Sequence, residues 1–225
     1  HFSTAQQAGG LTDAQWLLDP TYSSRARNWF QLDWQVMGVD ITQKKENHFW
    51  SNKFSYMRGI RNSIGFLKTI NIEDDGGNRN LNLDAYNNLS FESRYTQFFA
   101  NGITWSGGVR GFKGRTDRQL DEWGGSAESD ANFQNVIGSF SRDLDYTSLN
   151  AAAFNEMIFQ WKKFKLIPGV RYEFMRNEIS GQYSSAFQVT PQSKDRNVFL
   201  YGLGFEYHIN PENELVINYN RSFRP

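Results

Sequence analysis

The chain contains no cysteine among its 225 residues, and its 24 basic and 24 acidic side chains give a formal net charge of zero. Without cysteine there is no disulfide framework, thiolate metal site or cysteine nucleophile. Nucleic-acid-binding proteins normally show a basic excess gathered on one face, so no nucleic acid is expected as a partner.

Long apolar runs are also missing. No stretch of 18 apolar residues occurs, so the sequence contains no transmembrane helix. A membrane-spanning β-strand is still allowed, because it needs only about ten residues, of which every second one faces lipid. The opening His1-Phe2-Ser3 lacks the basic and apolar regions of a signal peptide, so we expect a mature segment or a fragment of a longer polypeptide.

Aromatic side chains, in contrast, are abundant. They make up 16% of the chain, with 19 Phe, 10 Tyr and 7 Trp, although hydrophobic residues of all kinds reach only 39%. This combination is what two aromatic girdles and a lipid-facing band require.

Hydrophobic residues recur with a period of two, which indicates β-strands. In the clearest run Leu166, Val170 and Tyr172 fall on one face, and Arg171 and Glu173 fall on the other. No segment carries a sustained helical stripe, so we predict an all-β fold with little helix. The expected eight strands lie at about 30–37, 46–60, 86–99, 102–116, 146–161, 166–177, 199–208 and 215–220.

The connections between these strands alternate between short and long. Short turns are expected at 43–46, 100–102, 162–163 and 210–213, and long loops at 1–26, 61–84, 117–145 and 180–195. Outer-membrane barrels alternate in this way, with tight periplasmic turns and long extracellular loops. A soluble β-sandwich or lectin-like jelly roll is the alternative, but it predicts more even connections and strands of five or six residues. We therefore predict an antiparallel transmembrane β-barrel.

Several stretches resemble one known family in their order and spacing. Residues 6–13 followed by 23–30 look like a loop and a strand start. Residues 92–99 followed by 108–110, and residues 154–156 followed by 166–173, look like two hairpins. Residues 218–225 look like the strand that opens the next extracellular loop. Together these stretches resemble the TonB-dependent outer-membrane receptors, and within them the ferric dicitrate receptor branch.

The resemblance implies a 22-strand barrel in the bacterial outer membrane, filled by an N-terminal plug domain. It also implies uptake of a ferric chelate with energy from the TonB–ExbB–ExbD complex, with a surface lipoprotein left open as a further partner. Residues 1–225 would supply about eight strands of this barrel, without the plug domain and the remaining strands. An open eight-strand sheet would leave unpaired edges in lipid, which disfavours an independent unit. A closed eight-strand barrel is the alternative.

The resemblance also suggests which residues bind the ligand. Ferric citrate is anionic and rich in carboxylates, and guanidinium groups bind carboxylates bidentately. Arg58 is the first choice, because the ferric dicitrate receptor pattern places an arginine near the top of a strand there. Further candidates at loops or strand ends are Arg25, Arg27, Arg61, Gln6 and Gln7. Arg115 and Arg118 at the end of the fourth strand are weaker candidates, and a loop-stabilising ion pair or solvated surface is the alternative for each arginine.

Other motifs predict no chemistry. The acidic stretch 73–78 lacks the spacing of a calcium loop, and the glycine-rich stretch 107–114 lacks the Gly-Lys-Ser/Thr ending of a phosphate loop. No catalytic residue, cofactor or metal is therefore expected, and the protein is not expected to be an enzyme. Four tryptophans on or near strand ends predict an interfacial girdle, namely Trp34, Trp50, Trp105 and Trp161.

Three functions remain open from the sequence. The first is TonB-coupled uptake of a ferric chelate. The second is a passive porin or a structural outer-membrane barrel within a larger assembly. The third is a soluble carbohydrate-binding β-domain.

Overall fold

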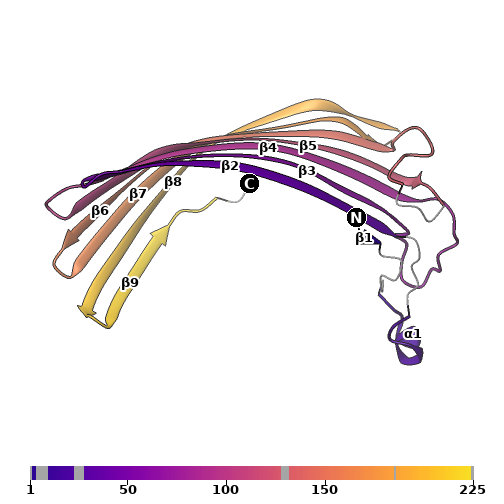
Figure 1. Cartoon of the computed structure of the whole chain (residues 1–225), viewed down its shortest axis with the longest axis horizontal. Helices are drawn as coiled ribbons and strands as arrows, with labels where there is room; N and C mark the ends of the chain where they lie inside the picture. Colours follow the sequence, from indigo (N-terminus) through magenta and orange to yellow (C-terminus); the bar gives the residue numbers. More distant parts are fainter. Residues whose placement is uncertain (1, 4–9, 23–27, 128–131, 185, 224–225) are drawn as a thin grey trace.

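A computed structural model describes residues 2–3, 10–22, 28–127, 132–184 and 186–223. They form one curved antiparallel sheet in which each strand pairs with its neighbours in the sequence (Figure 1). The strands are β1 (Phe2–Ser3), β2 (Trp29–Lys44), β3 (His48–Gly65), β4 (Arg79–Phe98), β5 (Ile103–Gly125), β6 (Arg142–Trp161), β7 (Phe164–Ser184), β8 (Phe187–Asn210) and β9 (Asn213–Asn220). No helix among the described residues is long and apolar enough to cross a membrane.

All eight predicted strands are present as β2 to β9, and the all-β prediction is confirmed. The strands are longer than predicted, because β3 to β8 have 18 to 24 residues each. About 9–11 residues suffice to cross a bilayer, so these strands continue well beyond a membrane. The two-residue β1, which pairs with the start of β2, was not predicted.

The predicted long loop at 180–195 is wrong. β7 continues to Ser184 and β8 begins at Phe187, and their residues pair through most of this range. The polar composition here misled the prediction, because a strand with water on both faces needs no apolar alternation. Backbone pairing and the ion pair between Arg176 and Asp195, with Nη2 2.7 Å from Oδ2, hold this hairpin instead. The other long connections are also shorter than predicted, at 66–78 and 126–141.

The connections gather at two opposite ends of the sheet (Figure 1). The turns of the β2–β3, β4–β5, β6–β7 and β8–β9 hairpins lie at one end, which we call the turn end. At one of them Gly102 has a φ of +78°, and a Cβ there would lie 2.8 Å from the Gln160 carbonyl oxygen. Helix α1 (Asp13–Leu18) and the connections 66–78 and 126–141 lie at the other, the loop end.

The strand registers define two faces of the sheet. In the half nearer the turn end, one face carries apolar side chains on every strand from β2 to β9, and we call it the band face. Typical exposed members are Ile41, Phe54, Val109, Val170, Leu203 and Ile217. Near the turn end the band face is rich in aromatic rings. The ring centroid of Tyr95 lies 5.5 Å from that of His48 and 5.9 Å from that of Trp105.

The other side, which we call the inner face, is polar in the same half. It carries a row of charges that includes Lys53, Glu92, Arg110 and Glu173. Lys53 is paired with Asp40, Nζ lying 3.4 Å from Oδ2. A sheet that is apolar on one face and charged on the other fits the wall of a membrane barrel, with lipid outside and a polar interior.

In the half nearer the loop end the pattern reverses along β2. In β2, Val39 and Ile41 lie on the band face, whereas Leu32, Trp34 and Val36 lie on the inner face. The band face of this half carries polar residues such as Gln35 and Asn87 instead. The period of two is kept, but its phase shifts by one residue between Val36 and Met37.

A small core ties the loops to the sheet at the loop end. Ile64, Leu81, Leu144 and Phe66 are almost fully buried. The amide of Phe66 donates to Asn28 Oδ1 at 2.9 Å, and the buried Arg79 donates from Nη2 to Asp74 Oδ2 at 2.7 Å. Most of the sheet has no such core, so its two faces depend on lipid and on what fills the interior.

Helix α1 interrupts the predicted loop 1–26. Thr12 caps it, because its hydroxyl accepts from the Gln15 amide while the Gln15 side chain accepts from the Thr12 amide. After the helix, the hydroxyl and the amide of Thr21 donate to Asp19 Oδ1 and lower the pKa of that carboxyl below its ordinary value.

Candidate ligand-binding site

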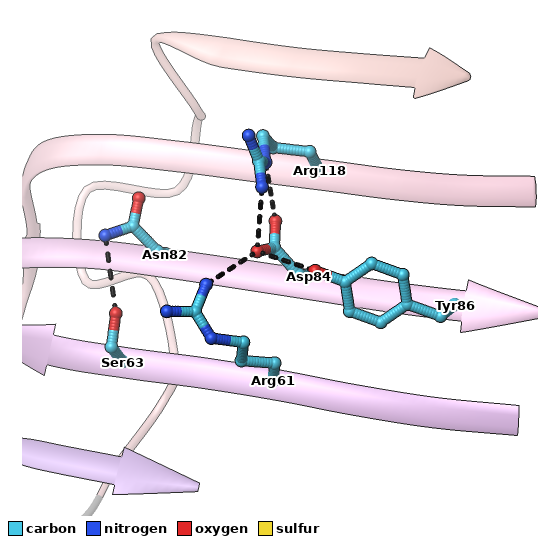
Figure 2. A network of polar contacts seen from close by, with 6 residues as sticks. All are labelled: Arg61, Ser63, Asn82, Asp84, Tyr86 and Arg118. Atoms are coloured by element: carbon cyan, nitrogen blue, oxygen red, sulfur yellow. Dashed lines mark hydrogen bonds and ion pairs between the residues drawn. The ribbon is translucent and has the colours of Figure 1, made fainter. Parts of the chain in front are cut away.

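A cluster of charged side chains lies on the inner face, in the half nearer the loop end (Figure 2). Arg61 of β3, Asp84 of β4 and Arg118 of β5 stand side by side, because the registers pair Arg61 with Asp84 and Asp84 with Arg118. Arg118 donates to both carboxylate oxygens, from Nε at 2.8 Å and from Nη2 at 3.1 Å. Arg61 Nη1 lies 3.6 Å from Asp84 Oδ2, and the Tyr86 hydroxyl donates to the same oxygen at 3.2 Å.

Burial differs sharply within this cluster. The Asp84 side chain is 4% exposed, whereas those of Arg61 and Arg118 are 54% and 43% exposed. Each guanidinium has five N–H donors, and only one or two of them in each arginine point at Asp84. The buried carboxylate therefore holds two guanidinium groups that keep donors available and carry a net positive charge. Such a pair is suited to bind a ligand carboxylate.

Aromatic rings flank the cluster on the inner face. The Trp34 and Tyr86 ring centroids lie 5.5 Å apart, and Arg61 Cζ lies 5.5 Å from the centroid of Phe30. Trp34 lies flat against Gly59 of the next strand, where a Cβ would come within 2.5 Å of Trp34 Cε3. The missing side chain of Gly59 thus provides the space that the indole ring of Trp34 occupies on the inner face.

The structure separates the predicted ligand-binding residues. Arg61 belongs to the cluster, but Arg58 lies three residues away on the same strand and therefore on the band face. Both lie within β3 rather than at its end, because the strand continues to Gly65. Arg25, Arg27, Gln6 and Gln7 lie outside the described residues.

The two weaker candidates also separate. Arg118 belongs to the cluster, whereas Arg115 lies on the band face. There its Nε lies 2.9 Å from both Asp117 Oδ1 and Asp145 Oδ1. Both arginines lie within β5 rather than at its end.

Sequence reasoning missed Asp84 and Tyr86. An acidic residue within a long strand was a usable signal, but its two arginines come from other strands, and their register is not readable from the sequence. The girdle prediction is wrong for Trp34, which lies on the inner face. Trp50, Trp105 and Trp161 do lie on the band face near the turn end.

A second inner-face feature lies in the half nearer the turn end. Arg94 and Arg171 place their Cζ atoms 5.0 Å and 5.7 Å from the Phe154 ring centroid. The three residues line a hollow of about 360 Å³, whose floor includes Gly169 and Gly202. Arg171 also donates to Glu173 at 2.5 Å, so these two residues form an ion pair on the inner face.

The described residues offer little else to a ligand. No group of three or more histidine, aspartate or glutamate side chains among them is placed to hold a metal ion.

The sequence profile of the family described as "TonB dependent receptor-like, beta-barrel" matches residues 1–225. The chain belongs to this family. TonB-dependent receptors are transport proteins of the bacterial outer membrane rather than enzymes, and the sheet described above is part of their barrel wall. A complete barrel of 22 strands is consistent with the family. A comparison with curated protein sequences gave no significant match.

Solved structures show the same fold. The chain is similar to the ferric citrate transporter FecA in its unliganded form, with a TM-score of 0.70, 19% identity, and coverage of 94% of this chain and 30% of that one. It is also similar to the ferric-catecholate import receptor Fiu from E. coli K12, with a TM-score of 0.61, 15% identity, and coverage of 88% and 36%. It is similar to the siderophore receptor PiuA from Acinetobacter baumannii as well, with a TM-score of 0.63, 12% identity, and coverage of 82% of this chain and 31% of that one.

Family membership orients the receptor wall. The turn end faces the periplasm and the loop end faces the outside. The band face contacts lipid, and the inner face lines the barrel interior. The Arg61–Asp84–Arg118 cluster thus lies on the interior wall in the extracellular half. The chain spans about a third of the length of the structures that it matches.

Proposed function

We propose that this chain is a segment of a receptor that takes up a ferric chelate of the citrate type with TonB-coupled energy. The observation that carries the proposal is the Arg61–Asp84–Arg118 cluster on the interior wall of the extracellular half. Two guanidinium groups there are held by one buried carboxylate and flanked by Trp34 and Tyr86. This arrangement supplies bidentate donors to carboxylates and a stacking surface beside them.

We further propose that other strands and a plug domain complete the protein. Among the described residues β9 pairs only with β8, so its second edge has no partner strand. Unpaired strand edges are not tolerated in lipid. The interior row of charges, from Lys53 to Glu173, is a suitable lining against which a plug could move when the TonB–ExbB–ExbD complex pulls on it.

The assignment of the transported ligand depends on the charge of the wall residues rather than on the fold. FecA is described as a ferric citrate transporter and OprC as a copper transporter, although both share this wall. One scaffold thus serves several ligands, and the residues on the wall decide between them. The cluster favours an anionic, carboxylate-rich chelate.

Binding of ferric citrate to the full-length receptor tests this proposal. The Arg118→Gln variant should bind ferric citrate at least about tenfold more weakly than the wild type, because a charge-assisted hydrogen bond contributes about 1.5–3 kcal/mol. Arg118→Lys should recover only part of the affinity, because an ammonium group lacks the bidentate geometry. Isothermal titration calorimetry provides the dissociation constants.

Arg176→Gln is the matched control, since it removes the same charge from the outside of the wall in the same half. Equal affinities of the wild type and Arg118→Gln would overturn the citrate assignment. The alternative, a passive porin or a structural barrel, is tested in cells. Uptake of the ferric chelate that persists without TonB would favour that alternative.

A further inference from the structure

Two cations lie on the band face at the upper border of the apolar band. Lys113 stands in the last row that is mainly apolar, directly across from Leu89 of β4 and Leu149 of β6. Arg58 stands in the next row towards the loop end, directly across from Asn87. Both side chains are exposed. In the membrane this border is where lipid tails give way to headgroups.

The two cations are close enough to act together. Arg58 and Lys113 are separated by β4 and by two residues along the strands, which places their backbones about 12 Å apart. Extended arginine and lysine side chains can span this distance from both sides. Asn87 lies between them on β4 and offers an amide donor.

The charges of Arg58 and Lys113 differ from those of neighbouring arginines, which are paired with carboxylates. Arg115 on the same face is held by Asp117 and Asp145, and Arg176 is held by Asp195. For Arg58 and Lys113 no ion pair is formed with any residue in the described part of the chain. Arg58 also lines a shallow hollow of about 280 Å³ together with Tyr56, Asn87 and Asp117.

We propose that Arg58 and Lys113, with Asn87 between them, bind the phosphate group of a lipid headgroup in the outer leaflet. Basic residues at a membrane surface attract anionic lipids, and each contributes about fivefold in affinity. Lys113 can extend its apolar stem along Leu89 while its ammonium reaches the headgroups. The guanidinium of Arg58 can bind a phosphate bidentately. This assigns Arg58 to the membrane side of the wall and is independent of the transported cargo.

Native mass spectrometry of the full-length receptor in detergent, titrated with lipid A, tests this site. Lipid A is a phosphorylated glycolipid, and its dephosphorylated form keeps the acyl chains without the phosphates. We expect the double variant Arg58→Gln/Lys113→Gln to bind lipid A about 25-fold more weakly than the wild type, at about fivefold for each cation. The dephosphorylated lipid should bind the wild type and the double variant equally.

The matched control is Arg110→Gln, which removes a cation from the inner face of β5, three residues from Lys113. It should leave lipid A binding unchanged. The charge-keeping variant Arg58→Lys/Lys113→Arg should retain most binding and serves as the test if the glutamine variant does not fold. Unchanged lipid A binding in the double variant would overturn the site. So would displacement of lipid A by inorganic phosphate at equal concentration, because the site would then bind free anions.

Discussion

The two halves of this sheet differ in the side chains that their faces carry. In the periplasmic half, apolar side chains such as Val170 point outward and charges such as Glu173 point inward. In the extracellular half, Arg115 and Asp145 point outward, while Trp34 and Leu32 point inward. The strands pass through without a break, so the change comes from the surroundings and not from the fold.

This difference shows what a period of two means in a membrane strand. The alternation reports that the two sides of the sheet have different surroundings, but it does not say which side is which. Where lipid ends and water begins outside, the apolar phase shifts to the interior, as between Val36 and Met37. On β2 the position of this shift marks the membrane border.

The largest expected loss of stability comes from a charge on the band face of the periplasmic half, compared with the same charge on the inner face. Val170→Arg puts a guanidinium into the apolar band and should lower the free energy of unfolding by about 2–4 kcal/mol. Val198→Arg makes the same change on the inner face of β8, directly across from Glu173, and should cost less than about 1 kcal/mol. Denaturant unfolding of the full-length receptor in detergent compares the two. Equal losses would mean that the faces are assigned wrongly.

A smaller effect is expected from the close contact in the extracellular half. Gly59→Ala forces the Trp34 ring from its place and should lower the free energy of unfolding by about 1–3 kcal/mol. The double variant Gly59→Ala/Trp34→Ala removes the clash, so its loss should be smaller than the sum of the two single losses. Urea unfolding followed by circular dichroism measures this coupling. Additive losses would show that Trp34 does not lie against Gly59.

The smallest effect is expected from the outward ion pair of the β7–β8 hairpin. Arg176 and Asp195 are both almost half exposed, so water and salt screen their attraction. Arg176→Gln should leave the unfolding midpoint unchanged, and those amides of residues 188–197 that bond to β7 should stay protected from hydrogen exchange. Rapid exchange of these amides in the wild type would instead support the long loop at 180–195 that the sequence predicted.

The sequence was sufficient for the fold where one side of a strand faces lipid. Leu166, Val170 and Tyr172 alternate so regularly that strand, face and membrane class could all be predicted. It was insufficient where water lies on both sides, as from Gln188 to Asn197, because polar strands and polar loops then have the same composition.

The candidate site was predicted only in part for a related reason. Arg61 and Arg118 were both named, but Asp84, which joins them, was missed. Asp84 and Arg118 lie 23 and 57 positions beyond Arg61 in the sequence. Only the registers of β3, β4 and β5 bring these side chains together. Arg58 was named as a ligand-binding residue although it lies on the band face, because the face of a residue depends on a register that the sequence does not display.

The tip of the β7–β8 hairpin has a consequence for recognition from outside the cell. Tyr183 and Phe187 are more than half exposed there, and their rings meet edge to face at a centroid distance of 6.5 Å. The paired strands below hold both rings in place, so an antibody would meet a preorganised epitope rather than a loop that must first be ordered. Nanobodies raised against this tip would therefore be suitable handles for labelling the receptor on living cells.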